Sequence, residues 1–304
     1  MKKIGFTLLF VLSSIVAWAQ PKEAYVLYNG QGERIEYGDM LKQLAQHDVV
    51  FFGEIHTCPI AHWLEIELTH ELHALHGDRF VLGAEMFERD NQVILNEYLG
   101  GLIDERNFKL ECKLWDNYDT DYEPLVTYAK THQVPFVATN VARRYANRVS
   151  KGGLEALDAI SDEGKRYIAP LPFDYKPNPH VQEFFTQMMK AAPAMKGMPG
   201  KKPNGMTSHR IAHLCQSQAL KDVTMAYSIA QHLGEGKMLH INGSFHSTRH
   251  HGIIPYLLDL KPNLKVGTIE VVRQADVTSL DSTSIGAADF IVCVPERMTS
   301  SQHK

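Results

Sequence analysis

The stretch from Asp48 to Gly77 constrains the fold most, because it predicts a strand, a turn and a helix in immediate succession. Residues 49–52 are valine and phenylalanine, a run typical of a strand that is buried on both faces. Gly53 ends the run. Pro59 suits the first position of a helix, where its missing N–H would have had no intrahelical partner, and Gly77 supplies the helix stop. A short buried strand followed directly by a helix is the basic unit of an α/β fold.

Three polar side chains fall where this strand meets its helix, namely Glu54, His56 and His62. In an open α/β sheet, ligands bind in the crevice beyond the carboxyl ends of the strands. Glu54 can act there as a general base, or it can orient His56 through the second ring nitrogen. His62, in the first helical turn, is expected to reach the same cleft.

A second stretch repeats the pattern. Residues 237–246, KMLHINGSFH, again hold a short apolar run that is followed by Gly243 and, three residues later, by His246. The chain therefore has two G-x-x-H segments, each after an expected strand. Two strands that neighbour a switch point would aim both imidazoles into one cleft.

Strand and helix patterns alternate along the chain, which predicts an α/β fold with a mainly parallel central sheet covered by helices on both faces. The residues 24–37 alternate apolar and polar around Asn29 to Gly32, a hairpin signal at a sheet edge. Further strands are expected at residues 80–85, 134–139, 237–242, 266–272 and 289–294. Helices are expected at residues 90–99, 207–233 and 252–260.

The segment from residue 150 to 205 has a different composition, dense in Pro, Gly and Lys, with one short helical stretch at 181–190. We interpret it as a helical insertion that lies over the sheet as a lid. A surface excursion without function is the alternative. Either way, residues 20–304 are expected to form one domain.

Composition places limits on function. The chain has 304 residues, of which 44% are hydrophobic and 22% charged, which is enough to bury a large core. Its formal net charge is −4, so no basic field is available to hold nucleic acid. We therefore expect no nucleic-acid partner.

Residues 1–19 have the pattern of a secretory signal peptide: Lys2 and Lys3, an apolar core at 4–16, and a small-residue site at 17–19. The mature chain is expected to begin at Gln20 and to be periplasmic or secreted. Export would allow disulfides, for which four cysteines permit three full pairings. These cysteines are Cys58, Cys112, Cys215 and Cys293.

His56, Glu85 and His246 each follow or end a separate expected strand. Two imidazoles and a carboxylate are a metal-ligand set that leaves room for water, and a divalent ion held there could activate that water for hydrolysis. Polar residues at strand ends also cap helices, which is the alternative for any one of the three.

Two further groups are candidates for ligand binding. His209 and His213 lie four residues apart, on one helix face, and could hold a metal or haem iron. Asn140 and Arg143, with Arg144, could take an anionic group such as a haem propionate or a substrate carboxylate. Exposed histidines and surface salt bridges explain these residues equally well.

Several segments of the chain together resemble the ChaN-like haem-binding uptake proteins, which are relatives of the Tiki metalloproteases and of erythromycin-esterase-type hydrolases. The similar segments, within residues 45–260, are GEIHTCPIAH, GAEMFERDNQ, ATNVARR, QALKDVTMA and NGSFHSTRHHGIIPYL. The resemblance implies an α/β core with a helical insertion. For the ChaN branch it also implies haem binding in iron uptake, with a tyrosine associated with the haem iron.

The resemblance also implies roles for individual residues. The Tiki pattern of two G-x-x-H motifs and an acidic residue falls on His56, His246 and Glu85, and the Glu-x-His pattern falls on Glu54 and His56, with His62 ending the motif. Gln218, Asp222 and Met225 match the long-helix motif. The haem tyrosine has no matching position, so its candidates are Tyr118, Tyr167 and Tyr175.

Two hypotheses follow. The first is an exported haem-binding protein of the ChaN type for iron acquisition, with possible partners in an outer-membrane haem-uptake system and a possible homodimer. The second is a metal-dependent hydrolase that uses Glu54, His56, Glu85 and His246. Apolar walls rich in Met, Tyr and His would favour a flat apolar cofactor such as haem, whereas a tight polar pocket over the three ligands His56, Glu85 and His246 would favour hydrolysis by a Tiki-like protease or an esterase.

Overall fold

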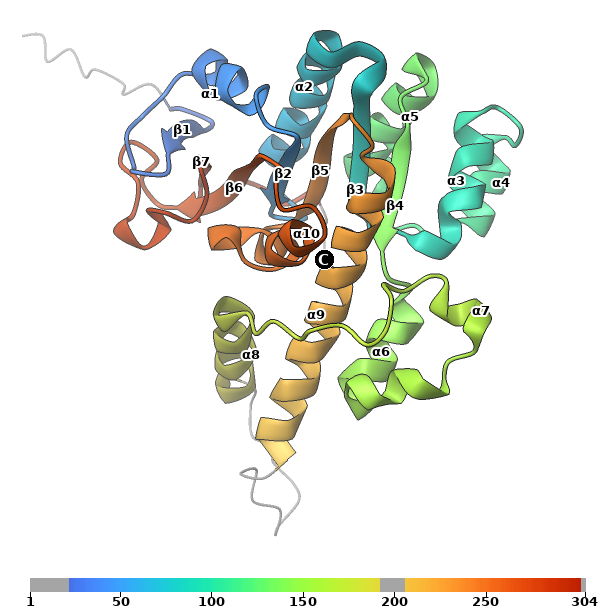
Figure 1. The fold of residues 1–304 in the computed structure, drawn as a ribbon. Coiled ribbons are helices and arrows are strands. Elements are labelled where there is room, and N and C mark those ends of the chain that lie inside the picture. Colours follow the sequence, from blue (N-terminus) through green and yellow to red (C-terminus); the bar gives the residue numbers. More distant parts are fainter. Residues whose placement is uncertain (1–21, 192–205, 302–304) are drawn as a thin grey trace, which may run out of the picture.

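Seven strands form one sheet in the order β1-β7-β6-β2-β5-β3-β4 in the computed structural model, which describes residues 22–191 and 206–301 (Figure 1). Every neighbouring pair is parallel except β1 and β7. The predicted, mainly parallel α/β fold is therefore confirmed. The strands are β1 (Val26–Asn29), β2 (Val49–Glu54), β3 (Phe80–Glu88), β4 (Phe136–Asn140), β5 (Lys237–Gly243), β6 (Val266–Gln274) and β7 (Phe290–Pro295).

Helices cover both faces of the sheet, because side chains of a buried strand point alternately to its two sides. Phe52 packs in the core that α2 helps to form, whereas Phe51 packs in the core on the side of α9 and α10. One layer holds α1 (Tyr37–Leu44), α2 (Pro59–His76) and α5 (Glu123–His132), and α3 (Gln92–Leu99) and α4 (Glu105–Glu111) continue it beyond β4. The other layer holds α9 (Met206–His232) and α10 (Ile253–Leu260).

The strand order places the two G-x-x-H segments side by side. β5 lies between β2 and β3, and Glu54 at the end of β2 is in register with Gly243 at the end of β5. The chain leaves β2 toward α2 on one face and leaves β5 toward α10 on the other. Adjacent strands whose connections diverge in this way form the crevice expected of a ligand site.

β3 differs from expectation at its carboxyl end. The sequence pattern suggested that the strand ends at Glu85, but β3 continues to Glu88. Its pairing with β4 shifts register between Ala84 and Glu88, and its pairing with β5 stops at Ala84. Glu85 therefore lies in a bulge, an irregularity that redirects side chains at sheet edges.

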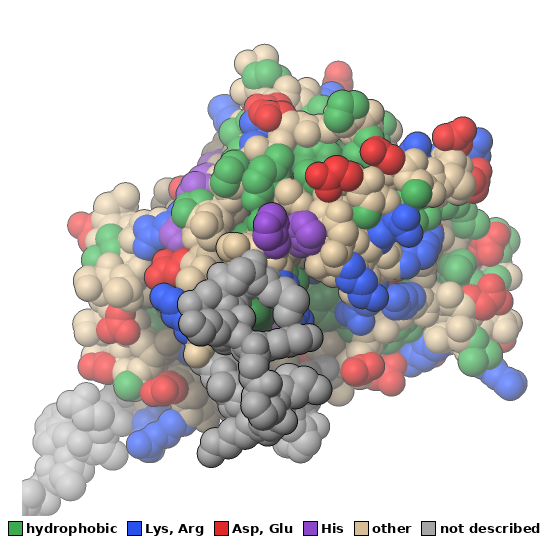
Figure 2. Space-filling view, turned by 90° about the horizontal axis from the view of Figure 1, so that it is seen from below, with side chains coloured by type: hydrophobic (Ala, Val, Ile, Leu, Met, Phe, Trp, Pro, Cys, Tyr) green, Lys and Arg blue, Asp and Glu red, His purple; other side chains and the backbone are tan. Residues whose placement is uncertain are grey.

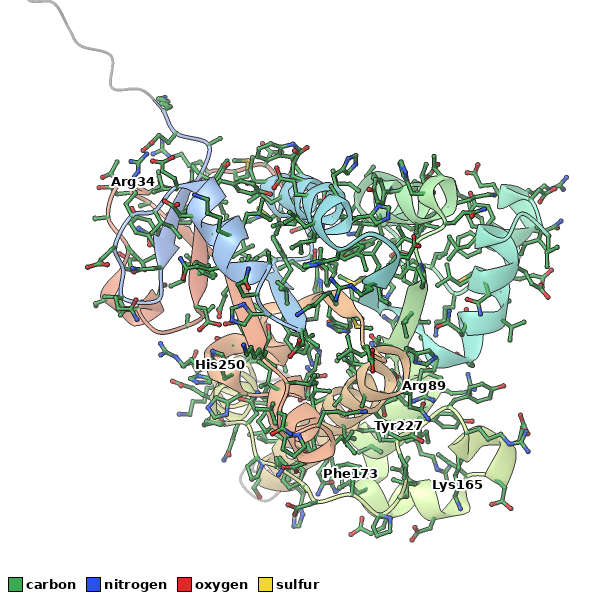
Figure 3. The ribbon with its side chains drawn as sticks, turned by 45° about the horizontal axis from the view of Figure 1, so that its top comes forward. Arg34, Arg89, Lys165, Phe173, Tyr227 and His250 are labelled. Atoms are coloured by element: carbon green, nitrogen blue, oxygen red, sulfur yellow. The ribbon has the colours of Figure 1, made fainter. Side chains whose placement is uncertain are left out.

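The amino-terminal segment forms an edge strand rather than a regular hairpin. β1 pairs with β7 along four residues, whereas the return segment contributes one isolated bridge, from Tyr28 to Arg34. Arg34, labelled in Figure 3, forms an ion pair with Glu23 at this edge.

The expected insertion lies beyond the carboxyl edge of the sheet, below it in Figure 1. It follows α6 (Arg143–Gly152), contains α7 (Asp162–Lys165) and α8 (Pro179–Ala191), and packs α8 against the first half of α9. Residues 192–205 of the predicted lid, and residues 1–19 of the predicted signal peptide, lie outside the described residues.

All four cysteines belong to the described part of the chain, and all are buried free thiols. They come from separate places: Cys58 precedes α2, Cys112 follows α4, Cys215 lies in α9 and Cys293 in β7. None of the three disulfide pairings that export would permit is formed in this fold.

Candidate functional site

A cavity of about 740 Å³ opens at the carboxyl edge of the sheet. Its floor is formed by the ends of β2, β3 and β5, and its walls come from α6, α8, α9 and the segment around Trp115. Figure 2 looks onto this edge from below, where histidine and basic side chains gather. Residues of the floor that the sequence had indicated are Glu54, His56, Glu85, Gly243 and His246.

His56 is held in a defined orientation within the cavity. Its Nδ1 lies 2.7 Å from Glu54 Oε1, and its ring contacts the edge of Trp115 at a centroid distance of 4.9 Å. A Cβ at Gly243 would lie 2.7 Å from His56 Nε2, so only glycine leaves room for the ring. No hydrogen bond of the described residues engages Nε2. Burial opposes the charged form of His56, but the carboxylates of Glu54 and Glu85 raise its pKa above the ordinary value.

His246 differs from His56 because both of its ring nitrogens are engaged. Nε2 lies 3.1 Å from Glu85 Oε1, and Nδ1 bonds to the carboxylate of Asp222 on α9. Burial lowers the pKa of His246, but Glu85 and Asp222 outweigh burial and raise it to about 9. The His246 cation in turn holds the pKa of Glu85 well below its usual range, against the effect of burial. Burial raises the pKa of Asp222, which His246 partly offsets, so the three side chains form a buried, tightly coupled network.

The expected trio of His56, Glu85 and His246 does come together at one edge of the sheet. Besides its contact with His246, Glu85 accepts a hydrogen bond of 2.9 Å from the backbone N–H of Gly243. A Cβ at Gly243 would lie 3.5 Å from Glu85 Oε2, on the same side as the His56 ring. Asp222, expected among ligand-binding residues, instead bonds to His246 and does not line the cavity.

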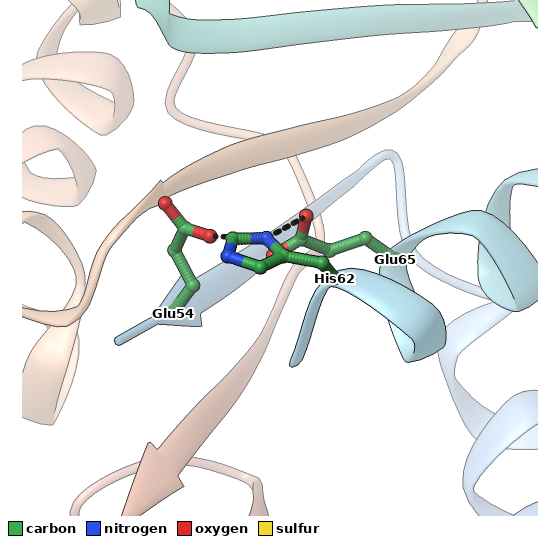
Figure 4. A group of neighbouring side chains, drawn as sticks. All are labelled: Glu54, His62 and Glu65. Carbon is green, nitrogen blue, oxygen red and sulfur yellow. Dashed lines mark hydrogen bonds and ion pairs between the residues drawn. The ribbon is translucent and has the colours of Figure 1, made fainter. Parts of the chain in front are cut away.

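A second cluster lies beneath the floor (Figure 4). His62 Nδ1 is 3.1 Å from Glu54 Oε2 and 3.3 Å from Glu65 Oε2. His62 is thus buried against carboxylates and does not line the cleft that its place in the first helical turn suggested. His62 lies on the buried side of α2, so its ring points toward Glu54 instead of into the cleft. Sequence reasoning missed Glu65, since a glutamate within a helix ordinarily faces solvent.

The residues around this second cluster were also not anticipated. Tyr122 donates a hydrogen bond of 2.8 Å to Glu54 Oε1. Asp121 Oδ2 lies 3.3 Å from His62 Nε2 and accepts a hydrogen bond from Asn117. The segment Tyr118–Tyr122, which follows Asn117, is a π-helical turn. Periodicity alone could not predict it, although π-helical turns are frequent at functional sites.

Asn140 and Arg143 both line the cavity, as the sequence suggested. Asn140 is buried and donates a hydrogen bond of 3.0 Å to the carbonyl of Glu85, whereas Arg143 is exposed at the rim. Arg144 pairs with Asp90 outside the cavity. Lys221, on the face of α9 that also carries Leu214, Ser217 and Gln218, adds a second basic side chain that sequence reasoning missed.

The other candidates lie outside the cavity, and no tyrosine of the described residues lines it. Tyr118 is buried in the core between Phe87 and Phe108. Tyr167 and Tyr175 are half-buried elsewhere in the insertion. His209 is exposed, and His213 lies against Gly153 at the end of α6.

Other contacts anchor the second helical layer rather than forming a site. Arg89, directly after β3, lies over the ring of Tyr227 at 5.2 Å from its centroid (Figure 3). Its guanidinium also donates to Ser228 on α9 at 3.2 Å. Lys165 and Phe173, also labelled in Figure 3, line a separate hollow of about 590 Å³ in the insertion.

Comparison with solved structures agrees with this fold. The chain is similar to ChaN of Campylobacter jejuni, with a TM-score of 0.65 and 17% identity over 88% of this chain and 96% of that one. It is also similar to a mutant of the erythromycin esterase EreC in its open conformation, with a TM-score of 0.50 and 10% identity over 92% and 99% of the two chains. At such identities the likeness shows the fold alone.

No curated protein matches the chain. Residues 40–257, however, match the model of the family described as haem-binding uptake, Tiki superfamily, ChaN. The match spans both G-x-x-H segments, the bulge of β3 and the long helix α9. The resemblance inferred from the sequence motifs is therefore confirmed, and the chain belongs to the ChaN family of haem-binding uptake proteins.

Proposed function

We propose that this protein binds haem in the cavity above β2 and β5, and that His56 supplies the nitrogen ligand to the iron. One observation carries the proposal: His56 presents an unengaged Nε2 at the cavity floor while Glu54 holds its Nδ1 at 2.7 Å. Imidazole is a common axial ligand of haem iron. A carboxylate on the second nitrogen fixes the ring and makes the ligating nitrogen more basic.

The cavity suits a flat, largely apolar cofactor that carries two carboxylates. Its volume of about 740 Å³ lies within the range of about 300–1,000 Å³ for ligand cavities. Trp115, Phe185 and Phe245 supply aromatic walls. Lys221 and Arg143 can pair with the propionates, and Glu85 is itself paired with His246.

When bound, haem would supply an iron centre, and the residues of this chain would hold it. His56 is placed by Glu54, whose Oε1 also accepts a hydrogen bond from Tyr122. Because no described tyrosine lines the cavity, we assign the iron ligand to His56 instead of to Tyr118, Tyr167 or Tyr175. His56 would then bind the iron without a tyrosinate.

A haemin titration of the purified protein tests this proposal. The wild-type chain should give a saturable Soret shift, and His56→Ala should weaken haemin binding by at least about tenfold, since one ligand bond is lost. His209→Ala, an exposed histidine outside the cavity, is the matched control and should bind like the wild type. Equal affinity of the His56→Ala variant would place the iron elsewhere.

The number of haem molecules is a separate question. The solved structure of the Campylobacter jejuni protein is described as cofacial haem binding. If two haems also stack here, the titration should end at two equivalents per site, and a homodimer should then form with haemin. Light scattering with and without haemin measures the dimer directly.

We also propose that the protein is exported and serves haem acquisition with an outer-membrane uptake system. The proposal rests on the signal-like residues 1–19. In the described part of the chain, no helix is long and apolar enough to cross a membrane. Mass analysis of the exported protein should show a chain that starts at Gln20. An intact Met1 on the folded, exported protein would contradict the proposal.

A further inference from the structure

A group of buried ligand atoms lies beneath the cavity floor, apart from the proposed haem site. Glu54, His62 and Glu65 each offer one ligand atom, and these atoms all lie within 4.8 Å of one another. Within residues 22–191 and 206–301, the trio of His56, Glu85 and His246 does not meet this criterion. The carboxylates of Glu54 and Glu65 are fully buried, and the His62 side chain is 6% exposed.

The charges in this group are not balanced by the protein alone. Carboxylates of Glu54, Glu65 and Asp121 surround the imidazole of His62, and Glu54 is also paired with His56, so three carboxylates face two imidazoles. Glu65 Oε1 and Glu54 Oε2 are buried without a hydrogen-bond partner among the described residues. A buried carboxylate oxygen without a donor is costly, so a positive species is expected between them.

The ring of His62 is oriented for ligation. Its Nε2 faces only acceptors, namely Asp121 Oδ2 and the carbonyl of His56, each at 3.3 Å. Nδ1 points to the two glutamates. Burial lowers the pKa of His62, but the carboxylates of Glu65 and Glu54 outweigh burial and raise it to about 11, so a metal ion would bind Nδ1 in place of a proton. Asp121 is itself held by Asn117 and Ser301, each at 2.6 Å. A carboxylate behind a histidine in this way is the usual support of a metal-ligating imidazole.

We propose that Glu54, His62 and Glu65 bind a divalent first-row metal ion. Oε1 of Glu54 is already engaged by His56 and Tyr122, which leaves Oε2 for the ion. One imidazole and two carboxylates suit Mn²⁺, Fe²⁺ or Zn²⁺, with open positions left for water. Glu54 also lines the cavity, so this one carboxylate belongs both to the cluster and to the cavity floor.

The ion would act on the cavity through Glu54. Both oxygens of this carboxylate would then be fixed, one by the ion and one by His56 and Tyr122. The orientation of the His56 ring would thus depend on an ion that does not touch the haem. The competing occupant is a proton, because burial, together with the charge of Glu54, raises the pKa of Glu65 to about 8.

A manganese-binding experiment shows whether the cluster holds a metal ion or a proton. Full-length protein, dialysed against a chelator, is titrated with Mn²⁺, and the loss of the free-ion signal is followed by electron paramagnetic resonance. The wild type should bind one equivalent tightly. Glu65→Gln, which has the shape of a protonated glutamate, should weaken binding by at least about 100-fold. Circular dichroism should show that this variant remains folded.

Two controls locate the ion. Glu67→Gln, on the same helix but outside the cluster, should bind like the wild type. Glu85→Gln, which disrupts the set around His246, should also keep the ion. Loss of the ion in Glu85→Gln, or retention in Glu65→Gln, would overturn the proposal.

A measurement on the wild-type protein alone tests the proposed ion site without relying on any variant. The electron spin echo of bound Mn²⁺ should show modulation from one imidazole nitrogen, that of His62. Absence of nitrogen modulation, or failure of the wild type to bind either Mn²⁺ or Zn²⁺, would mean that a proton occupies the cluster instead.

Discussion

At the scale of single residues, the two histidines of the G-x-x-H segments have different chemical states although their sequence contexts are alike. His56 contacts one carboxylate and keeps Nε2 unengaged, whereas His246 lies between Glu85 and Asp222 with both nitrogens in use. A histidine with one unengaged nitrogen can bind iron. A histidine held between two carboxylates instead stabilises the floor that carries it.

A third histidine, His240, leads to a prediction about how the stability of the protein depends on pH. It is fully buried in β5, bonded to Thr139 at 2.9 Å and Asn242 at 3.0 Å, and burial lowers its pKa to about 4. The unfolded chain, with an ordinary histidine pKa near 6.5, binds the proton more readily. Stability from this residue is therefore present above about pH 6.5 and is lost as the pH falls toward 4.

The loss amounts to about 3 kcal/mol in the free energy of unfolding, since each unit of pKa difference corresponds to about 1.4 kcal/mol. Urea unfolding of the wild type and of His240→Gln at pH 7 and pH 4.5 measures it. The variant should lose less stability than the wild type over this range. An equal loss in both proteins would show that His240 does not titrate in this way.

At the scale of elements, local patterns predicted the strands well, because buried runs such as Val49 to Phe52 have a composition that few other structures share. The convergence of His56, Glu85 and His246 also followed, since the carboxyl ends of parallel strands meet at one edge. The bulge after Ala84 could not be predicted, because it depends on how β3 pairs with β4 and β5. The pairing of strands that are far apart in the sequence cannot be read from the residue pattern of a short segment.

The buried cluster was missed for a related reason. Glu65 is a glutamate in a helix, and its neighbours Asp121 and Tyr122 come from a π-helical turn more than fifty residues later. Only the packing of α2 against that turn makes the three residues neighbours. Likewise, Lys221 reaches the cavity because α9 crosses its wall, which the helical pattern alone did not specify.

The position of helix α8 leads to a prediction about haemin binding. It contributes Phe185 to the cavity wall, and the adjacent Phe184 packs on Phe245 at a ring-centroid distance of 4.8 Å. Phe185→Ala should weaken haemin binding by about tenfold, because an aromatic side chain that is buried against a ligand contributes about 1–2 kcal/mol. Fluorescence quenching by haemin measures the change.

The matched control is Gln187→Ala on the same helix, an exposed residue that does not line the cavity. This variant should bind haemin like the wild type. If Phe185→Ala also binds like the wild type, α8 is not a wall of the haem site, and other residues of the cavity would have to enclose the cofactor.

At the scale of the whole molecule, the fold builds two sites on one carboxylate. The divergence of the chain after β2 and β5 opens the crevice, α6, α8 and α9 wall it, and Glu54 lies between the cavity and the cluster below. The chain belongs to a family of haem-binding uptake proteins, and we propose that these residues form its haem site. The central claim is that His56 ligates the iron.

Resonance Raman spectroscopy of the haem complex tests this claim most directly. The ferrous complex of the wild type should show an iron–histidine stretching band, and His56→Ala should lack that band while His209→Ala keeps it. A tyrosinate–iron band in the ferric wild-type complex, or an iron–histidine band that persists in His56→Ala, would contradict the assignment of His56 as the ligand.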